Sequence, residues 1–351
     1  MILFNVTHVF HFVHSINPEN GGVAEAVVSL NKQLIDIGVH SEVTDNPNFL
    51  TSKSAVIVAH GLWQWPSAQA YLRFKQNDIP YVLFPHGMLD PWFKKAYRLK
   101  HLKKQTYWWC KESKFISNAK ALCFTTEEER VLAQKTFWPY SCNEVVTGLG
   151  VKDPPNNVTE QCATFLSEYP KLRDKKVLLY LGRFHPKKGV DLLINSFARK
   201  SSKNEVLVLA GPIDQPDKYL KGLQKLAKKL PQKIIWTDML HGDLKWGALR
   251  CADALILPSH QENYGMVVAE ALSVETPVFL TNKVNLWREV IDSNCGIVAQ
   301  NDQNGIDTLI EKWSRNEHAK MHSNAGLCFR NKLHIQKAAK KICKVLEVVT
   351  P

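Results

Sequence analysis

Short apolar runs alternate with helical patterns along most of this chain, and few folds accommodate that order. The first series of apolar runs lies at about 8–13, 55–60, 81–85, 121–125 and 144–147, with helical patterns between them at about 22–37, 66–76, 97–118 and 127–135. A second series of apolar runs lies at about 177–181, 205–210, 233–236, 254–257 and 278–280. Strands separated by helices form parallel sheets with crossover helices on their faces. The sequence therefore predicts an α/β protein with two Rossmann-like domains.

A break rich in proline and asparagine at 151–157 separates the two series. A chain of 351 residues is long enough for two domains that each bury a core. We place the first domain at 1–155 and the second at 170–330, followed by a carboxyl-terminal helix at 331–351. No apolar run reaches the roughly 20 residues that a membrane span requires, and we expect no signal peptide at the amino terminus.

The segment 254–272 combines an apolar strand, a short polar loop and a helix with regularly spaced apolar residues. Backbone N–H groups at the start of such a helix bind anions readily. The residues at this position are Asn263, Tyr264 and Gly265. Glu262 and Glu270 flank the position, and because carboxylates repel phosphate they are better suited to bind hydroxyls of a ribose and a sugar. The alternative interpretation is a surface helix with ordinary acidic residues.

A second strand, loop and helix lie at 177–198. The loop contains Gly182, Arg183 and Lys188, and α/β proteins build phosphate sites in such loops at the carboxyl ends of strands. Arg183 can bind two phosphate oxygens at once, whereas Lys188 supplies a mobile point charge. Basic residues on a solvated surface are the alternative for this loop taken alone.

Five motifs follow one another in a recognisable order. They are Gly21-Gly22 at the first helix start, His60-Gly61-Leu62-Trp63 after one strand, Pro85-His86-Gly87-Met88-Leu89-Asp90-Pro91-Trp92 after another, Gly182-Arg183-x4-Lys188-Gly189, and Glu262-x7-Glu270. Together they resemble the retaining glycosyltransferases of family 4, and the third motif is similar to the branch that builds bacterial surface polysaccharides. The resemblance covers about residues 8–300. It implies the GT-B fold, in which two Rossmann-like domains face each other across a cleft, with the carboxyl-terminal helix crossing back to the first domain.

The resemblance implies transfer of a hexose-type sugar from a UDP- or GDP-sugar to a glycan or lipid-linked glycan during surface polysaccharide synthesis. A leaving nucleoside diphosphate accumulates negative charge, which Arg183, Lys188 and the N–H groups of 263–265 would stabilise. Because the chain contains no Asp-x-Asp motif, we expect a metal-independent enzyme without a cofactor beyond its donor substrate. By resemblance, Glu262 binds hydroxyls of the transferred sugar and Glu270 binds the ribose.

The first domain contributes further candidates, each with a structural alternative. By resemblance, His86 contacts the donor sugar or the acceptor; a turn histidine is the alternative. Asp90 is either a general base or a capping carboxylate. Gly22 lets the backbone approach the donor phosphates or the acceptor, or it is an ordinary loop glycine. His60 and Trp63 form either a wall of the acceptor site or aromatic packing beneath the following helix.

Positive charge is concentrated in residues 92–115. This segment holds eight Lys or Arg, one acidic residue and seven aromatic residues, within a chain of formal net charge +12. A basic helix with interfacial aromatic residues can lie on an anionic membrane or bind a phosphorylated lipid acceptor. A solvated basic face over packed aromatic residues is the alternative.

Three alternatives to an active glycosyltransferase are a nucleic-acid-binding protein, a dehydrogenase and an inert relative. A sequence pI of about 9.2 suggests nucleic-acid binding, but no known nucleic-acid module is present, and we expect no nucleic-acid partner. A dehydrogenase is disfavoured because no Gly-x-Gly-x2-Gly follows either first strand. A relative that binds sugar nucleotide without turnover remains an alternative. The eight cysteines lack Cys-x2-Cys spacing, which predicts reduced thiols in a cytoplasmic protein. The basic segment 92–115 would allow reversible contact of this protein with the inner face of the plasma membrane.

Overall fold

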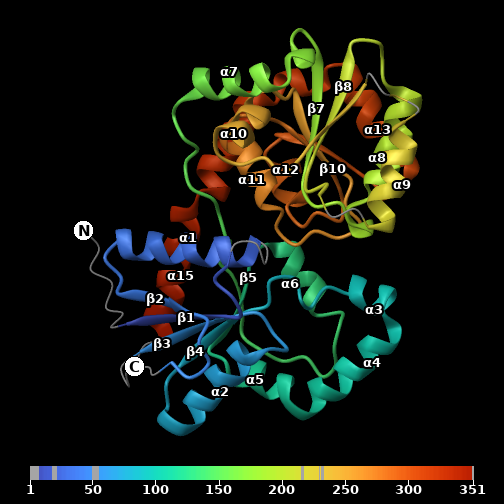
Figure 1. The fold of residues 1–351 in the computed structure, drawn as a ribbon. Helices are drawn as coiled ribbons and strands as arrows, with labels where there is room; N and C mark the ends of the chain where they lie inside the picture. Colours follow the sequence, from blue (N-terminus) through green and yellow to red (C-terminus); the bar gives the residue numbers. More distant parts are fainter. Residues whose placement is uncertain are drawn as a thin grey trace. The chain divides into compact units, whose positions relative to one another are not determined.

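A computed structural model describes residues 8–17, 22–49, 55–214, 217–228, 230 and 233–349. The chain divides into a first unit, residues 1–152 with 333–351, and a second unit, residues 153–332. Each unit contains one six-stranded sheet whose strand pairs are all parallel, with helices on both faces (Figure 1). The predicted α/β fold with two Rossmann-like domains is thus confirmed.

The sheet of the first unit has a switch point, where the strand order reverses, between its second and third strands. Its strands are β1 (Val9–Val13), β2 (Ser41–Thr44), β3 (Val56–His60), β4 (Tyr81–Phe84), β5 (Ala121–Phe124) and β6 (Glu144–Val146). They lie in the order β2-β1-β3-β4-β5-β6, so the chain proceeds outward in one direction from β1 and in the other from β3. Ligands of open α/β sheets bind at the carboxyl ends of the strands flanking such a switch point.

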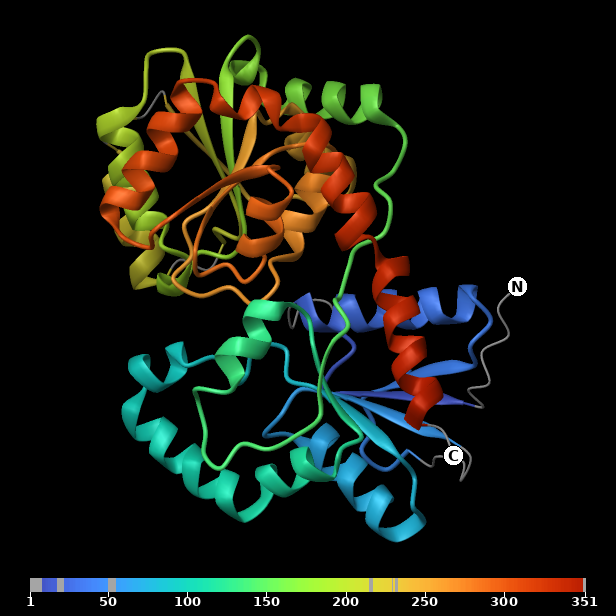
Figure 2. The same ribbon diagram turned by 180° about the vertical axis from the view of Figure 1, so that it is seen from behind.

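Alternating side chains of these strands enter two separate cores, because successive residues of a strand point to opposite faces. Val56 and Val58 face a core that includes residues of α1 (Gly22–Asp36) and α15 (Ile335–Val349). Ile57 faces a core shared with α2 (Trp65–Asn77) and the segment after β4. Figures 1 and 2 show α15 beside α1, although α1 ends at Asp36 and α15 begins only at Ile335.

The other helices of the first unit follow β4 and β5. They are α3 (Trp92–Ala96), α4 (Arg98–Tyr107), the π-helical turn η2 (Trp108–Glu112), α5 (Ser113–Asn118) and α6 (Glu127–Ala133). No helix among the described residues is both long and apolar enough to cross a membrane.

The sheet of the second unit has its own switch point. Its strands are β7 (Lys176–Leu181), β8 (Glu205–Ala210), β9 (Ile234–Thr237), β10 (Ala254–Leu257), β11 (Val278–Thr281) and β12 (Gly296–Ala299). The order β12-β11-β10-β7-β8-β9 makes β7 and β10 neighbours, although β8 and β9 come between them in the chain. The loops that follow β7 and β10 therefore emerge side by side at the carboxyl edge.

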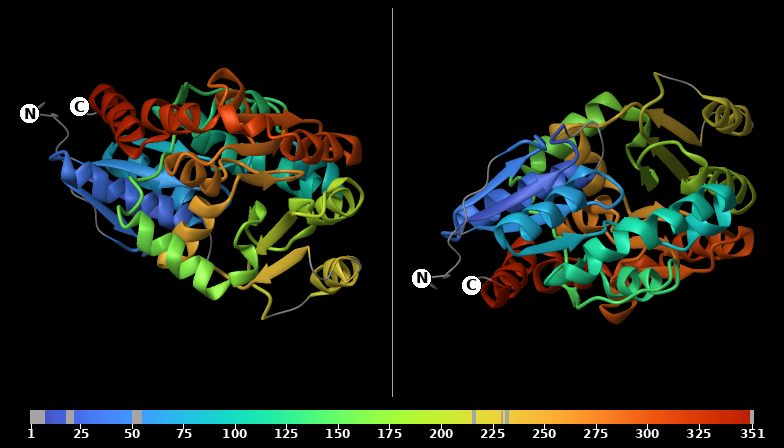
Figure 3. Two further views of the ribbon diagram at one scale, coloured as in Figure 1. Left: turned by 90° about the horizontal axis from the view of Figure 1, so that it is seen from above. Right: turned by 90° about the horizontal axis from the view of Figure 1, so that it is seen from below.

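Helices cover both faces of this second sheet. They are α7 (Val158–Glu168), α8 (Val190–Lys200), α9 (Lys218–Ala227), α10 (Gly242–Cys251), α11 (Met266–Ser273), α12 (Trp287–Asp292), α13 (Gln303–Ser314) and α14 (His322–Cys328), with short helical turns at η3 (Pro170–Leu172), η4 (Pro186–Lys188), η5 (Glu317–Lys320) and η6 (Phe329–Leu333). Helices α8 and α9 lie side by side near β8 and β9 (Figure 3).

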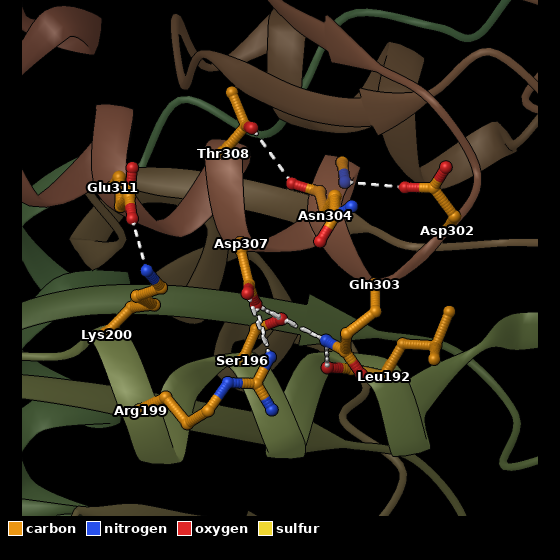
Figure 4. A network of polar contacts seen from close by, with 11 residues as sticks. Leu192, Ser196, Arg199, Lys200, Asp302, Gln303, Asn304, Asp307, Thr308 and Glu311 are labelled. Atoms are coloured by element: carbon orange, nitrogen blue, oxygen red, sulfur yellow. Dashed lines mark hydrogen bonds and ion pairs between the residues drawn. The ribbon is translucent and has the colours of Figure 1, made fainter.

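A polar network joins α8 to α13 (Figure 4). The carboxylate of Asp307 accepts hydrogen bonds from Arg199 Nη2 at 2.6 Å and from Ser196 Oγ at 2.5 Å, and Gln303 Nε2 donates to Ser196 Oγ at 2.6 Å. Burial opposes ionisation of Asp307, but these donors hold its pKa below the usual value. Because α8 follows directly after Gly189, the network also fixes the start of the helix behind the loop after β7.

Two strands, β2 and β12, are absent from the sequence prediction. Each lies at the edge of its sheet and has only four residues. Residues Ser41 to Thr44 are mostly half-buried and polar, so an apolar run does not mark them. The predicted helix at 97–118 is also interrupted, because η2 inserts a π-helical turn between α4 and α5.

Candidate functional site

The loop after β7 is bound tightly to the loop after β10. Gly189 has φ +64°, and a Cβ added there would lie 2.3 Å from the carbonyl oxygen of Pro258, so only glycine fits without displacement. The backbone N–H of His260 donates to the carbonyl of Lys187 at 2.7 Å. The two predicted site loops therefore form one surface at the β7–β10 switch point.

The loop after β10 is anchored on its other side by the segment after β11. Glu262 N donates to Lys283 O at 2.9 Å, and Asn285 N donates to Glu262 O at 3.0 Å. The side chain of Tyr264 is buried, and Asn263 Oδ1 accepts a hydrogen bond from Asn285 Nδ2 at 3.3 Å. These side chains shape the loop.

Gly265 converts the loop into α11. It has φ +71° and occupies the position before Met266, the first residue of that helix. The predicted helix start is therefore present, and Glu270 lies further along the same helix. The structure thus gives the segment 254–272 the strand, loop and helix that its sequence pattern indicates.

Two ion pairs involve the predicted carboxylates. Lys188 and Glu262 are paired across the two loops, and their side chains are 13% and 21% exposed. Glu270 Oε1 lies 2.7 Å from Nζ of Lys245 on α10, with 10% and 20% exposure. No local sequence pattern relates Lys245 to a carboxylate 25 positions away, so this contact was not predicted.

Arg183 differs from these lysines in that its side chain is exposed. Within the described part of the chain it forms no ion pair with a carboxylate, so its guanidinium is available to an anion. The surroundings are cationic: burial, with smaller contributions from Lys187 and Arg183, lowers the pKa of the nearby His185. The loop after β7 thus carries an exposed guanidinium at Arg183 and an ammonium at Lys188 that is paired with Glu262.

The first unit holds three hydrogen-bonded histidines at its own switch point. His11 Nδ1 lies 2.8 Å from His60 Nε2, and His60 Nδ1 lies 2.9 Å from His86 Nε2. Burial lowers the pKa of His11 to about 3 and of His86 to about 4. Burial, with repulsion from the other two rings, also lowers the pKa of His60. The predicted site residue His86 is therefore one end of a neutral chain of imidazoles.

His60 and Trp63 both take part in packing. His60 is only 2% exposed, and its ring stacks with those of His11, His86 and Phe84. The half-buried Trp63 ring packs against Trp108 and Phe137, with the ammonium of Lys104 4.6 Å from its centroid. Aromatic packing is therefore present at both residues, and a contact with the acceptor stays a prediction.

Other candidates of the first unit are placed as follows. Asp90 Oδ1 accepts a hydrogen bond from Trp92 N at 2.7 Å, which is the capping arrangement. Gly22 is the exposed first residue of α1, whereas Gly21 lies outside the described residues. No cluster of three His, Cys, Asp or Glu side chains suited to a metal ion is found in the described ranges.

The basic segment 92–115 divides its apolar residues between core and surface. Trp108 and Phe115 are buried, whereas Leu99 is 83% exposed and Leu102 is 63% exposed. A surface cavity of about 550 Å³ lies beside this segment, lined by Lys94, Gln105, Lys135, Trp138 and Tyr140 among others. Exposed apolar groups and cations thus share one face of the first unit.

Comparison with protein families identifies both halves of the chain. Residues 164–327 match the model "Glycosyl transferases group 1", and residues 48–146 match the model "Glycosyl transferase 4-like domain". The two matched ranges fall on the two units, one in each. Each unit thus matches a glycosyltransferase domain model over part of the chain, and the fold is of the GT-B type.

Relatives of known sequence are similar over part of their length. A D-inositol 3-phosphate glycosyltransferase from Frankia alni is 30% identical over 171 residues, which cover 44% of this chain and 40% of that protein. An uncharacterised glycosyltransferase from Methanocaldococcus jannaschii is 28% identical over 152 residues, covering 41% of this chain and 38% of that protein. The matches thus span about two fifths of these relatives.

Solved structures resemble the whole chain. Anabaena HepE, solved with UDP and glucose, aligns with a TM-score of 0.75 at 13% identity, covering 97% of this chain and 100% of that one. WaaG, a glycosyltransferase involved in lipopolysaccharide biosynthesis, aligns with a TM-score of 0.68 at 18% identity, covering 97% and 99%. Sucrose-phosphate synthase from Thermosynechococcus elongatus aligns with a TM-score of 0.75 at 15% identity, covering 96% and 97%. At these identities the likeness establishes the fold.

Proposed function

We propose that this protein is a retaining glycosyltransferase that transfers a hexose-type sugar from a UDP- or GDP-sugar to a glycan or lipid-linked glycan. The reaction proceeds without a metal ion and serves the synthesis of a surface polysaccharide. Anabaena HepE, whose fold is similar, has been solved with UDP-glucose, which supports a nucleotide-sugar donor for this chain as well.

The observation that carries this proposal is the close packing of the loops after β7 and β10 at their switch point. Parallel α/β sheets bind nucleotides at such a position. The exposed Arg183 supplies a bidentate donor, and the paired Lys188 and Glu262 place a cation and a hydrogen-bond acceptor side by side. This combination suits a sugar diphosphate, which presents phosphate oxygens next to hydroxyl groups.

The charges suggest how the leaving group is stabilised. Lys245 neutralises Glu270, and Lys188 is paired with Glu262. The positive charge of Arg183 is therefore available to bind the diphosphate. As the bond to the anomeric carbon breaks, negative charge grows on the diphosphate, and Arg183 and Lys188 bind it more strongly than in the ground state. Glu262 retains a second oxygen for sugar hydroxyls, and Glu270 retains one for the ribose.

Two residues of the first unit are further proposed ligand contacts. His86 contacts the donor sugar or the acceptor, and Gly22 at the start of α1 allows the backbone to approach a phosphate or sugar closely. The backbone of 263–265 at the start of α11 would bind the donor phosphates.

A screen of donors tests the proposal. The purified protein is incubated with UDP-sugars and GDP-sugars, and thermal shift and donor hydrolysis are both measured, with and without EDTA. We expect one donor class to raise the melting temperature and to be hydrolysed slowly to the nucleoside diphosphate, with rates unchanged by EDTA. Binding without hydrolysis or transfer would instead show an inert sugar-nucleotide-binding relative.

The stereochemistry is tested on the product of that reaction. Nuclear magnetic resonance of the transferred sugar reports its anomeric configuration directly. Retention requires the configuration of the donor to persist in the product. An inverted product would contradict the retaining mechanism while leaving the donor site intact.

We further propose that segment 92–115 binds an anionic membrane surface reversibly. The exposed Leu99 and Leu102 would enter the headgroup region, while neighbouring lysines bind anionic lipid. The adjoining cavity, with Lys94 and Lys135 in its lining, has the cations and aromatic groups to accept the phosphorylated end of a lipid-linked acceptor. This placement would keep the protein at the inner face of the plasma membrane, where such acceptors are available.

A further inference from the structure

His11, His60 and His86 form what we call the histidine ladder. His11 lies on β1, His60 is the last residue of β3, and His86 follows β4 by two positions. Strand register places His60 opposite Val13 on one side and Phe84 on the other. The ladder therefore runs from the middle of β1 to the carboxyl ends of β3 and β4, and it begins at the β1–β3 switch point.

The two hydrogen bonds of the ladder couple the tautomers of its rings. A neutral imidazole has one N–H donor and one acceptor nitrogen. Each link uses Nδ1 of one ring and Nε2 of the next. If His11 donates through Nδ1, then His60 must also carry its proton on Nδ1, and so must His86. The three neutral rings are therefore either all Nδ1–H or all Nε2–H.

The two ends of the ladder decide between these states. Nε2 of His11 is buried without a hydrogen-bond partner. In the Nε2–H state this atom would be a buried donor with no acceptor, which is rarer in proteins than an unsatisfied acceptor. In the Nδ1–H state it is an unsatisfied acceptor, and the free N–H lies at the other end, on the partly exposed His86. The all-Nδ1–H state is therefore favoured.

The backbone at His86 is held in a strained conformation by separate contacts. His86 has φ +48°, which non-glycine residues seldom adopt and which often marks functional sites. The next residue, Gly87, donates its N–H to Glu129 Oε1 at 2.6 Å. The backbone N–H and the hydroxyl of Thr125 both donate to the other carboxylate oxygen of Glu129. The hydrogen bond to His60 thus orients the ring of His86, and the contact between Gly87 and Glu129 holds its main chain.

We propose that His11 and His60 are positioning residues that hold His86 as a neutral hydrogen-bond donor, presenting Nδ1–H to a sugar hydroxyl. The identity of the ligand rests on the proposed function, whereas the state of the ladder does not. In this state His86 does not act as a general base through Nδ1, because that atom already carries the proton. Nδ1 of His86 could accept a proton only if the ladder first adopted the all-Nε2–H state, which would leave His11 with a buried, unpartnered N–H.

The tautomers can be measured without any substrate. Long-range ¹H–¹⁵N correlation spectra of the full chain, labelled in histidine, distinguish Nδ1–H from Nε2–H rings at pH 7. We expect His11, His60 and His86 all in the Nδ1–H form. An Nε2–H form or a charged ring at His86 would overturn the inference.

Breaking the ladder separates positioning from a structural role. In His60→Phe, which conserves a ring of similar size, we expect His86 to show a mixture of tautomers. The control is His40→Phe, an exposed histidine of the same unit, which should leave the His86 signals unchanged. A His86 that remains wholly Nδ1–H in His60→Phe contradicts positioning by the ladder. If His60→Phe does not fold, His11→Phe removes the buried end instead, and the wild-type spectrum still decides the tautomer.

Turnover then links the ladder to the reaction. With the donor identified by the screen, we expect His60→Phe to lower kcat/KM by about 10- to 100-fold, the range seen when residues that orient a ligating histidine are lost. Wild-type turnover in a variant whose His86 tautomers are mixed would overturn the positioning role. Absence of sugar transfer by the wild-type protein would instead contradict the proposed function, while the spectra would still test the ladder.

Discussion

Nζ of Lys245 on α10 lies 2.7 Å from Oε1 of Glu270 on α11, and both side chains are largely buried. The pair places a neutralised carboxylate beside the proposed donor site. Removing one partner leaves the other as an uncompensated, partly buried charge. Lys245→Ala should therefore lower the free energy of unfolding by about 1–3 kcal/mol, measured by urea denaturation.

Lys312→Ala is the matched control for that variant. Lys312 pairs with Glu317 at 3.4 Å, but its side chain is 41% exposed, and an exposed pair of this kind contributes under about 1 kcal/mol. Equal losses in the two variants would show that the Lys245–Glu270 pair has no special role.

The donor site predicts a graded set of defects. Arg183→Ala should weaken binding of the nucleotide sugar by roughly 10- to 100-fold, since a charge-assisted contact is lost. Lys188→Ala and Glu270→Ala should weaken it as well, whereas Glu262→Ala should reduce kcat more than affinity. Calorimetric titration with the donor and steady-state kinetics measure the two effects.

An exposed lysine of the same unit serves as the reference. Lys203→Ala removes a positive charge outside the two loops and should leave donor affinity unchanged. If Arg183→Ala and Lys188→Ala each bind the donor with wild-type affinity, the donor binds elsewhere.

The membrane surface is tested by co-sedimentation with liposomes. The wild-type protein should prefer anionic over neutral vesicles, and its binding should weaken with added salt. The double variant Leu99→Ser and Leu102→Ser should lose most of the bound fraction, because two exposed apolar groups no longer enter the headgroup layer. Leu327→Ser, at a 49% exposed leucine of the second unit, should bind as the wild type does. Equal binding to both vesicle types rules the surface out.

The histidine ladder should make stability depend on pH. Burial depresses the folded-state pKa of His11 to about 3 and of His86 to about 4, below the ordinary value of 6.5. Between these values the unfolded chain binds protons that the folded chain does not, so the contribution is complete above pH 6.5 and is lost as pH falls toward 4. The melting temperature of His11→Phe should accordingly fall less between pH 7.5 and pH 5 than that of the wild type. A His40→Phe control should keep the wild-type pH dependence.

Glu112 should make stability change with pH in the opposite direction. Burial raises its pKa to about 7, an effect partly offset by Ser67, the Trp63 backbone and Lys104. The folded chain then holds this proton more tightly than the unfolded chain, whose carboxyl has a pKa near 4.5. Ionisation therefore costs stability as pH rises from 4.5 to 7.

Replacing this carboxyl by an amide removes the cost. Glu112→Gln should gain up to ~3 kcal/mol relative to the wild type across that pH range, and should level off above pH 7. Denaturation curves at pH 5, 6, 7 and 8 measure the difference. A constant difference at all four values would show that Glu112 titrates normally.

The sequence predicted the two site loops because their signals are local. A buried strand, a glycine-containing loop and a helix start follow one another within about 20 residues at 177–198 and at 254–272. The edge strand β2 was missed because three of its four residues are polar, whereas β12, Gly296–Ala299, is apolar and was overlooked.

Contacts between residues that lie far apart in the chain left no comparable signal in the sequence. His11 and His60 are 49 positions apart, and His60 and His86 are 26 apart, so their hydrogen bonds depend on strand register rather than on any local pattern. The place of His60 between two other histidines could not be predicted for this reason. Lys245 was overlooked because only the packing of α10 near α11 brings it to Glu270.

The sequence alone therefore determined that the chain forms two parallel α/β domains, and which charged residues stand at the ends of β7 and β10. The periodicity of apolar residues encodes that information between near neighbours in the chain. Tertiary structure alone decided that Lys188 pairs with Glu262, that Lys245 pairs with Glu270 and that three histidines form a ladder. Strand order, register and helix packing are set by burial of apolar surface across the whole domain, and no single segment contains them.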